Sequence, residues 1–430
     1  MVVIIGGFMK TLAVRMYGKN DLRLEEFELA PLKDNEIRVK NVTDSICMST
    51  YKAANQGPEH VRVPQDIAEN PVIIGHEICG EILEVGKDWE GQYRVGDKFV
   101  VQPAHNKNGS LEAPGYSYTQ YGGDATYGNM PAEIMEMNCL LPYNGEAFFM
   151  GSLTEPVSTV IGGFNSLYHH TEKGSYDHVM GMKEDGNLAL IASVGPMGLS
   201  AIAYVFAMAR EGKKAKRVLI TDINQARLDR AESIYTPASA KELGFELKYM
   251  NTSGDDAVAR MMAFTDDEGY DDMIVFAPVP VLIQQAQSML RYDGCINFFS
   301  GPTDTSFSVP INMYDIHYNN HHLVGNSGGN NEDLREATRL ISEGKLDAAP
   351  MVTHILGLDD VAYVTNNVPA IPGGKKLVYP HCKIELTAIE DFAEKGKTDK
   401  RFADLAEIME RSNQIWNAEA EKYVLDNFAI

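Results

Sequence analysis

Paired cysteines are absent from this sequence. Its 430 residues include five cysteines, and no two of them form a C-x-x-C pair. An odd number of widely spaced cysteines does not make a disulfide framework, which excludes the class of small secreted proteins held together by disulfides. We therefore expect a reducing compartment and a cytoplasmic location.

Long apolar runs are absent as well. The segment Val2–Phe8 is apolar, but it has no basic residue before it and is far shorter than the roughly 20 residues that cross a bilayer. We expect no transmembrane helix and no membrane partner. Met9-Lys10-Thr11 has the form of an alternative start, so we interpret residues 1–8 as an upstream extension.

Basic residues are scarce relative to acidic ones. The chain has 38 Lys and Arg against 60 Asp and Glu, which gives a net charge of −22. Sequence-independent nucleic-acid binding depends on Lys and Arg contacts to phosphate, so this composition argues against a nucleic-acid partner. The acidity serves solubility. The 44% of apolar residues is typical of a globular protein, here with about two or three domains.

The first third of the chain has the patterns of β-strands. Residues 36–42 alternate between apolar and polar side chains, and 80–86 and 95–101 are further strand-like segments near glycines. Residues 102–128 are rich in Gly, Asn, Tyr and Ser. We expect a β-rich region followed by a long irregular lobe.

From residue 188 onward the pattern is that of an α/β domain. Leu188–Ala192 is a continuous apolar run, typical of a strand buried on both faces, and a helical pattern follows at 199–209. Further strand-like segments alternate with helical ones; the strands are expected at 217–222, 272–276 and 295–299, and the helices at 281–290 and 332–342. This alternation predicts a parallel sheet. The charged tail after about residue 385 is predicted to be helical.

A possible metal site is distributed over three segments. His76 lies in Gly75-His76-Glu77, Cys47 lies upstream, and Glu155 lies downstream before a proline. Thiolate, imidazole and carboxylate together suit zinc. Taken singly, Cys47 could be a buried apolar cysteine, His76 a core histidine, and Glu155 a carboxylate in a first helical turn. Their joint occurrence favours the metal site.

These segments resemble the zinc-dependent medium-chain dehydrogenase/reductase family. The signature G-H-E-x-x-G-x5-G is matched by Gly75, His76, Glu77, Gly80 and Gly86. The C-x-[ST] segment is matched by Cys47 and Ser49, and residues 152–158 resemble the L-x-E-P-x-S segment of the polyol branch. The resemblance covers roughly residues 9 to 385. It implies an α/β protein with a GroES-like β-rich catalytic domain and a Rossmann cofactor domain built on a doubly wound parallel sheet.

The resemblance also implies domain order and assembly. We expect the first part of the catalytic domain at 1–160, the NAD(P)-binding Rossmann domain at 161–348, the return segment of the catalytic domain at 349–385, and a helical C-terminal extension at 386–430. The family suggests a homodimer or homotetramer.

By the same resemblance, one catalytic Zn2+ is held by Cys47, His76 and Glu155, while Glu77 has a supporting role. The open position on such an ion would bind the substrate oxygen. Ser49 matches the relay hydroxyl of the family. Lys52 replaces the relay histidine of many relatives, and it could carry protons, bind an anionic group or simply be a surface lysine. Because residues 102–138 contain no cysteine, we predict no structural zinc.

A candidate cofactor turn follows the first buried strand. Its residues open a helix, as a dinucleotide-binding turn does; they are Gly195, Pro196, Met197 and Gly198. Asp222 ends the next strand, where a carboxylate would bind both ribose hydroxyls and repel a 2′-phosphate. This favours NAD(H) over NADP(H), although nearby Arg227 weakens the preference and Asp222 could be a turn residue.

The expected reaction is hydride transfer between NAD(P)H and a ketose or polyol. The segments 43–47, 52–57 and 71–77 most resemble the branch of the family that reduces a ketose phosphate, such as L-sorbose 1-phosphate, to a hexitol phosphate. The basic residues near this region are Lys52, His60 and Arg62. An alternative is an NAD-dependent dehydrogenase of an unphosphorylated polyol or secondary alcohol. A catalytically silent binding or structural relative is a further alternative, which the intact Cys47, His76 and Glu155 set disfavours.

Overall fold

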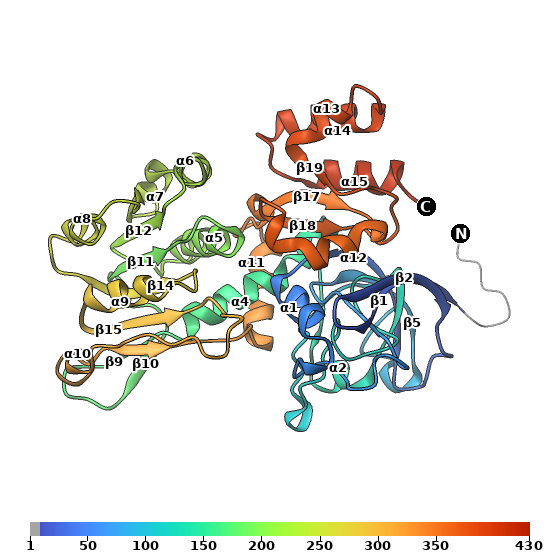
Figure 1. The fold of residues 1–430 in the computed structure, drawn as a ribbon, viewed down its shortest axis with the longest axis horizontal. Coiled ribbons are helices and arrows are strands. Elements are labelled where there is room, and N and C mark those ends of the chain that lie inside the picture. Colours follow the sequence, from blue (N-terminus) through green and yellow to red (C-terminus); the bar gives the residue numbers. More distant parts are fainter. Residues whose placement is uncertain (1–8) are drawn as a thin grey trace. The chain divides into compact units, whose positions relative to one another are not determined.

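The chain folds into two compact units (Figure 1). The structure is a computed structural model that describes residues 9–430, so the predicted upstream extension lies outside the described residues. Unit 1 contains the described residues up to Glu155 together with Ile341–Glu343 and Val352–Ile430. Unit 2 contains Pro156–Leu340 and Gly344–Met351.

Unit 1 is the β-rich unit. An eight-stranded sheet has the order β19-β17-β18-β3-β5-β6-β8, with β7 paired to β3, and a three-stranded sheet has the order β2-β1-β4. The pairs are antiparallel except for β17 with β18. The strands are β1 Lys10–Gly18, β2 Asp21–Glu28, β3 Ile37–Ser45, β4 Val72–Ile73, β5 Cys79–Val85, β6 Lys98–Val101, β7 Tyr127–Met130, β8 Leu140–Pro142, β17 Val352–Leu356, β18 Lys375–Val378 and β19 Thr387–Ala388.

Short helices connect and cover these strands. They are α1 Met48–Gln56, α2 Ala132–Glu136, α3 Phe148–Ser152, α12 Leu358–Asn367, α13 Phe392–Lys395, α14 Lys400–Arg411 and α15 Ala418–Asn427, with 3-10 turns η1 Gly57–Glu59, η2 Lys87–Trp89, η3 Lys107–Gly109, η5 Val368–Ala370 and η6 Ile389–Asp391. The segment 102–126 contains no helix or strand except η3, as the expected irregular lobe requires.

The sheet of unit 1 is packed tightly enough to require glycine at one signature position. A Cβ on Gly80 of β5 would lie 2.1 Å from the backbone oxygen of Lys40 on β3. A residue with a Cβ atom does not fit at such a distance, so glycine at position 80 allows β3 and β5 to pair closely. The apolar side chains on this sheet form a core that includes Ile37, Ile82 and Phe99.

The C-terminal extension is an integral part of unit 1. Trp416 is fully buried, and its indole N–H donates to the Tyr379 hydroxyl at 2.9 Å. The Glu421 carboxylate accepts hydrogen bonds from the backbone N–H groups of Phe148 and Phe149 at 2.6 and 2.7 Å, which satisfies two donors at the start of α3. The predicted helical tail therefore folds against the body of its own unit.

Unit 2 is built on a six-stranded parallel sheet. Its order is β13-β12-β11-β14-β15-β16, which is the 3-2-1-4-5-6 order of a Rossmann fold. The strands are β11 Asn187–Ile191, β12 Arg217–Asp222, β13 Glu246–Asn251, β14 Tyr270–Val275, β15 Leu290–Phe298 and β16 His322–Val324, and a separate hairpin consists of β9 Tyr168–His170 and β10 His178–Met180. Every residue of β11 is buried, as predicted.

Helices flank this sheet (Figure 1). Those of the unit are α5 Pro196–Arg210, α6 Gln225–Ile234, α7 Pro237–Glu242, α8 Ala257–Phe264, α9 Pro280–Ser288, α10 Met313–Asn319, α11 Asn331–Ser342 and the turn η4 Ala349–Met351, while α4 Thr154–Asn165 crosses the boundary between the units. Apolar residues of α8 and α9 pack with those of β11 and β14 in one core, including Met261, Ile283 and Met273. Among residues 9–430, no helix combines the length and apolarity that crossing a membrane requires.

Candidate active site

Cys47 and His76 meet beside the first turn of α1. Cys47 is the N-cap of α1, directly after β3, and His76 lies in the loop between β4 and β5. The Ser49 hydroxyl lies 3.0 Å from Cys47 Sγ and 3.1 Å from His76 Nε2, while Thr50 Oγ1 lies 3.2 Å from His76 Nδ1. Ligand atoms of Cys47, His76 and Glu77 all lie within 4.8 Å of one another. The turn of α1 thus orients the imidazole toward the thiol.

A buried acidic pair fixes the loop that carries His76. Gly75 has φ +88°, and a Cβ there would lie 2.0 Å from Oδ2 of Asp44. Oδ1 of Asp44 accepts a hydrogen bond from the backbone N–H of Glu77 at 2.7 Å. Burial, and then the charges of Asp124 and Glu77, raise the pKa of Asp44 well above its usual range. The signature glycine is therefore required by both its backbone conformation and the carboxyl group against it.

Glu77 forms a buried ion pair. One carboxylate oxygen contacts Nζ of Lys375, and the other accepts a hydrogen bond from the Ser45 hydroxyl. Lys375 is only 5% exposed, although it opens β18 about 300 residues from Glu77 along the chain. Sequence analysis missed Lys375. The available signal was Gly373-Gly374-Lys375-Lys376 at the start of an apolar strand, an unusual entry into a core for two lysines.

Glu155 interacts electrostatically with Cys47, His76 and Glu77. Burial above all raises the pKa of Glu155 to about 8; the charge of His76 opposes this rise, and those of Glu77 and Cys47 add to it. Burial and the charge of Glu77 also raise the pKa of Cys47. The structure thus brings Cys47, His76 and Glu77 together, whereas Glu155 is linked to them through their charges, with Lys375 as the cation that acts on both Cys47 and Glu155.

This donor set fits a zinc ion. Sulfur, nitrogen and oxygen donors are the ligands that zinc takes in proteins, and a divalent cation lowers the pKa of a coordinating thiol or carboxyl. Such an ion would reverse the rises in the pKa values of Cys47 and Glu155, so the residues present suit the metal electrostatically as well as chemically.

Basic residues gather beside the same cluster. Tyr116, which is buried, donates a hydrogen bond to Ser49 Oγ at 2.9 Å, and its ring stacks on His60 with 5.7 Å between centroids. Burial, and then the charges of Arg62 and Lys52, lower the pKa of His60. The backbone N–H of Arg62 donates to His60 Nδ1 at 3.2 Å, and Lys52 lies one helical turn after Ser49 on α1, so both cations flank this site. Sequence analysis did not single out Tyr116, because the irregular lobe has no periodicity that ranks its tyrosines.

The candidate cofactor turn has the geometry of a dinucleotide site. Gly195 is the N-cap of α5, and Pro196, Met197 and Gly198 form its first turn. A Cβ on Gly198 would lie 2.0 Å from the Ser193 backbone oxygen, whereas a Cβ on Gly195 would meet nothing within 4 Å. Gly198 thus permits close packing of strand and helix, and the space at Gly195 leaves the helix N-terminus accessible to an anion.

Asp222 ends β12, as expected. Its Oδ1 accepts a hydrogen bond from the backbone N–H of Asn224 at 2.9 Å, so it does stabilise a turn. Arg227 is exposed in the first turn of α6, and its backbone N–H donates to the Asn224 side chain at 3.1 Å. A role of Asp222 or Arg227 toward a ribose stays a prediction.

The chain is similar to known proteins along nearly its whole length. Residues 33–138 match the alcohol dehydrogenase GroES-like domain, and residues 196–343 match the zinc-binding dehydrogenase family. The chain is 44% identical to a mannitol-1-phosphate 5-dehydrogenase of Aliivibrio fischeri, over 98% of this chain and 99% of that one. It is also 44% identical to an L-sorbose 1-phosphate reductase of Klebsiella pneumoniae, over 96% and 97% respectively.

A solved structure supports the same fold. The 2R,3R-butanediol dehydrogenase of Bacillus subtilis aligns with a TM-score of 0.67 over 86% of this chain and 99% of that one, at 24% sequence identity.

Proposed function

Because this chain belongs to the zinc-binding dehydrogenase family, we propose that it reduces a ketose phosphate, specifically L-sorbose 1-phosphate, to a hexitol phosphate with NADH. The observation that carries the proposal is the group formed by Lys52, His60 and Arg62 beside the Cys47 and His76 cluster. An unphosphorylated polyol has no charge for such a group to bind. The 44% identity to the L-sorbose 1-phosphate reductase supports the same substrate class.

We assign the zinc ion to Cys47, His76 and Glu155. Glu77 holds the His76 loop through its backbone N–H and pairs with Lys375, which suits it to a supporting role rather than to a third ligand. When bound, zinc polarises the substrate carbonyl and stabilises the negative charge that develops on its oxygen as hydride arrives.

The reaction also needs a proton. Hydride moves from NADH to the carbonyl carbon, and a proton must reach the carbonyl oxygen to give the alcohol and NAD+. Ser49 touches both Cys47 and His76 and accepts a hydrogen bond from Tyr116, so we assign the proton to a path from Tyr116 through Ser49. Burial raises the pKa of Tyr116 well above its usual range, so the phenol stays neutral and keeps its hydrogen bond to Ser49, and a proton that leaves along this path must be replaced from solvent.

Lys52 and Arg62 are assigned to the substrate phosphate. In a chain of net charge −22, a local pair of cations attracts a phosphorylated substrate that the rest of the surface repels. Arg62 is held in place by its guanidinium, which donates to the Leu111 backbone oxygen at 2.8 Å. We further assign the pyrophosphate of NAD(H) to the turn Gly195–Gly198 and the adenosine ribose to Asp222, and we expect a cytoplasmic homodimer or homotetramer.

A second candidate substrate is mannitol 1-phosphate. The relative from Aliivibrio fischeri bears that name and is as similar to this chain as the sorbose phosphate reductase. Both substrates carry a phosphate at one end of a six-carbon chain. The two substrates differ in the carbon atom that reacts. The rate of NAD+ reduction with mannitol 1-phosphate tests this second candidate separately.

Progress curves of NADH oxidation test the proposal. With L-sorbose 1-phosphate, kcat/KM is expected to exceed that with free L-sorbose by about 100-fold or more, since each charged hydrogen bond contributes about 1.5–3 kcal/mol. Equal values of kcat/KM for L-sorbose 1-phosphate and free L-sorbose would contradict the assignment of a phosphate-binding site. Lys52→Met is expected to raise KM for the phosphate ester by about tenfold and leave free L-sorbose unaffected. Lys87→Met, which removes an exposed lysine paired with Asp34, serves as the matched control.

A further inference from the structure

A second group of metal-binding side chains lies in unit 2, at the end of the parallel sheet. Ligand atoms of His170, Asp293 and His322 lie within 4.8 Å of one another. His322 Nε2 is 2.9 Å from Asp293 Oδ1, and His170 Nδ1 contacts the same oxygen. The three side chains are between 9% and 15% exposed, so they converge away from bulk water.

A fourth imidazole is adjacent. His178 lies directly opposite His170 in the β9–β10 hairpin, and their ring centroids are 4.7 Å apart. The ring of His178 is exposed and lies 6.2 Å from that of His322 and 5.0 Å from that of Tyr168, so its side chain would have to rotate to bring a nitrogen to Asp293. Three imidazoles and one carboxylate thus come from the hairpin, β15 and β16.

The backbone at Asp293 is unusual in a way that serves this convergence. Asp293 has φ +63°, a left-handed conformation that non-glycine residues adopt only at some cost. The pairing of β14 with β15 shifts register between Tyr270 and Asp272, next to this residue. Irregularities of this kind redirect a side chain within a sheet, and here the carboxylate is directed at two histidines.

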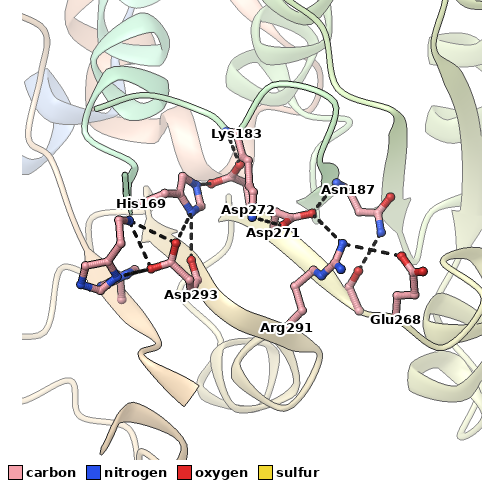
Figure 2. A network of polar contacts seen from close by, with 11 residues as sticks. His169, Lys183, Asn187, Glu268, Asp271, Asp272, Arg291 and Asp293 are labelled. Atoms are coloured by element: carbon pink, nitrogen blue, oxygen red, sulfur yellow. Dashed lines mark hydrogen bonds and ion pairs between the residues drawn. The ribbon is translucent and has the colours of Figure 1, made fainter. Parts of the chain in front are cut away.

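A supporting set of contacts holds the group from behind. His169 Nδ1 donates to the backbone oxygen of Asp293 at 2.9 Å, and its Nε2 lies 2.9 Å from Oδ1 of Asp272. Asp272 in turn accepts from the backbone N–H of Lys183 at 2.8 Å. Figure 2 shows Asp293 and His169 in a polar network that continues through Asp271 to Arg291. Such support is what fixes ligand orientation in metal sites.

We propose that His170, Asp293 and His322, with His178 as the fourth ligand, bind a second Zn2+ that fastens the β9–β10 hairpin to the end of the sheet. Imidazole nitrogens with one carboxylate match zinc rather than magnesium or calcium, which take oxygen ligands. Around a tetrahedral zinc, ligand atoms at bond lengths of about 2.0–2.2 Å lie about 3.4 Å apart, so the 2.9 Å hydrogen bond between His322 and Asp293 would open by about half an ångström when the ion replaces its proton. The site is independent of hydride transfer and differs from the cysteine-based structural zinc whose absence the sequence predicts.

Zinc binding by chelator-stripped, full-length protein tests the proposal. The background is Cys47→Ser, which removes the thiol of the first cluster. Calorimetric titration with Zn2+ is expected to give one bound equivalent in this background and none after addition of Asp293→Asn. Asparagine tolerates the left-handed backbone at this position, so the fold is expected to persist. His317→Gln, which changes an exposed histidine of α10, is the matched control and is expected to keep the equivalent.

Cobalt distinguishes the two sites by their ligands. Co2+ bound to the Cys47 cluster is expected to show a thiolate-to-metal charge-transfer band, whereas Co2+ at the histidine site has no sulfur ligand and is expected to show only d–d bands that vanish in Asp293→Asn. Retention of the equivalent by a folded Asp293→Asn protein, or its absence before that change, would overturn the second site. If circular dichroism shows that Asp293→Asn does not fold, His322→Gln replaces it in the same titration and is likewise expected to lose the bound equivalent. Failure of the proposed function leaves these readouts unchanged.

Discussion

The two units each gather imidazole and carboxylate groups, but they do so in different chemical settings. In unit 1, His76 is joined by a thiol and by Glu77, whose charge is balanced by the buried Lys375. In unit 2, the Asp293 carboxylate contacts two histidines and its group contains no sulfur. The unit 1 cluster combines soft and hard ligands with the neighbouring hydroxyl groups of Ser49 and Tyr116, which suits a catalytic zinc ion. The unit 2 group takes its imidazoles from three strands, which suits a structural ion that would hold those strands together. Similar residue types therefore lie in different chemical surroundings in the two units, according to their partners.

Removing the thiol of unit 1 has the largest expected effect. Cys47→Ser should lower kcat/KM on the order of 1000-fold, because zinc contributes several kcal/mol to the transition state. NADH binding, measured by fluorescence titration, should remain within about twofold because the residues that we assign to the cofactor lie in unit 2. Cys139→Ala, at a buried cysteine of unit 1 outside the cluster, should keep full turnover. An active Cys47→Ser enzyme would show that the unit 1 cluster does not carry the reaction.

The next largest effect is expected from the buried ion pair between Lys375 and Glu77 in unit 1. Lys375→Met leaves the Glu77 carboxylate uncompensated, so the free energy of unfolding of chelator-treated protein should fall by about 3–5 kcal/mol. The double variant Lys375→Met with Glu77→Gln should recover much of this loss. Lys376→Met is the matched control, since Lys376 donates to the Gly374 backbone oxygen. Additive losses in the double variant, measured by urea denaturation, would mean that the two residues do not compensate each other.

In unit 2, substitutions of Asp222 are expected to change the preference between NADH and NADPH. Asp222→Ala should shift the ratio of kcat/KM for NADH over NADPH toward NADPH by about 10- to 100-fold, through loss of charged hydrogen bonds. Asp222→Asn keeps an acceptor for the Asn224 N–H and removes only the charge. The Asn variant should therefore relax the preference without loss of stability. An unchanged ratio in both variants would leave Asp222 with its turn role alone.

Acid should act on unit 1 through a half-buried histidine, with the smallest expected effect. Burial, and then the charge of Lys40, lower the pKa of His381 to about 4, and its Nε2 donates to the Thr126 backbone oxygen at 3.0 Å. Because the folded pKa lies below the unfolded value near 6.5, this stability is present above pH 6.5 and lost as pH falls toward 4.

At pH 5 the loss amounts to about 2 kcal/mol relative to pH 7. His381→Gln, which retains a donor, should reduce the acid sensitivity of unfolding by that amount, and His317→Gln should not. Identical pH profiles for wild type and His381→Gln would contradict the assignment.

The sequence allowed prediction of what local patterns encode. The fully apolar run at Leu188 predicted β11, and the glycines at 195 and 198 predicted the start of α5, because both depend on neighbouring residues. The family and its two-part fold were also predicted correctly. The metal ligands stay a prediction, although the structure does bring Cys47 and His76 together.

Features that depend on distant parts of the chain were missed. Lys375 approaches Glu77 only because β18 pairs with β3, and no local pattern marks a buried lysine. His170, Asp293 and His322 converge only through the order of strands and an irregularity in β15. The polar, alternating strand β13 was also overlooked, since it lacks the apolar run of its neighbours.

Zinc content and turnover, determined on the same preparations, test most directly whether zinc in unit 1 carries out the reaction. Wild type, Cys47→Ser and His322→Gln are purified without chelator, and each is assayed for zinc per chain and for NADH oxidation with L-sorbose 1-phosphate. We expect two zinc ions and activity in wild type, one zinc ion and no activity in Cys47→Ser, and one zinc ion with activity in His322→Gln. Full turnover in a Cys47→Ser protein that lacks zinc at that cluster would contradict the proposal that zinc chemistry in unit 1 drives the reaction.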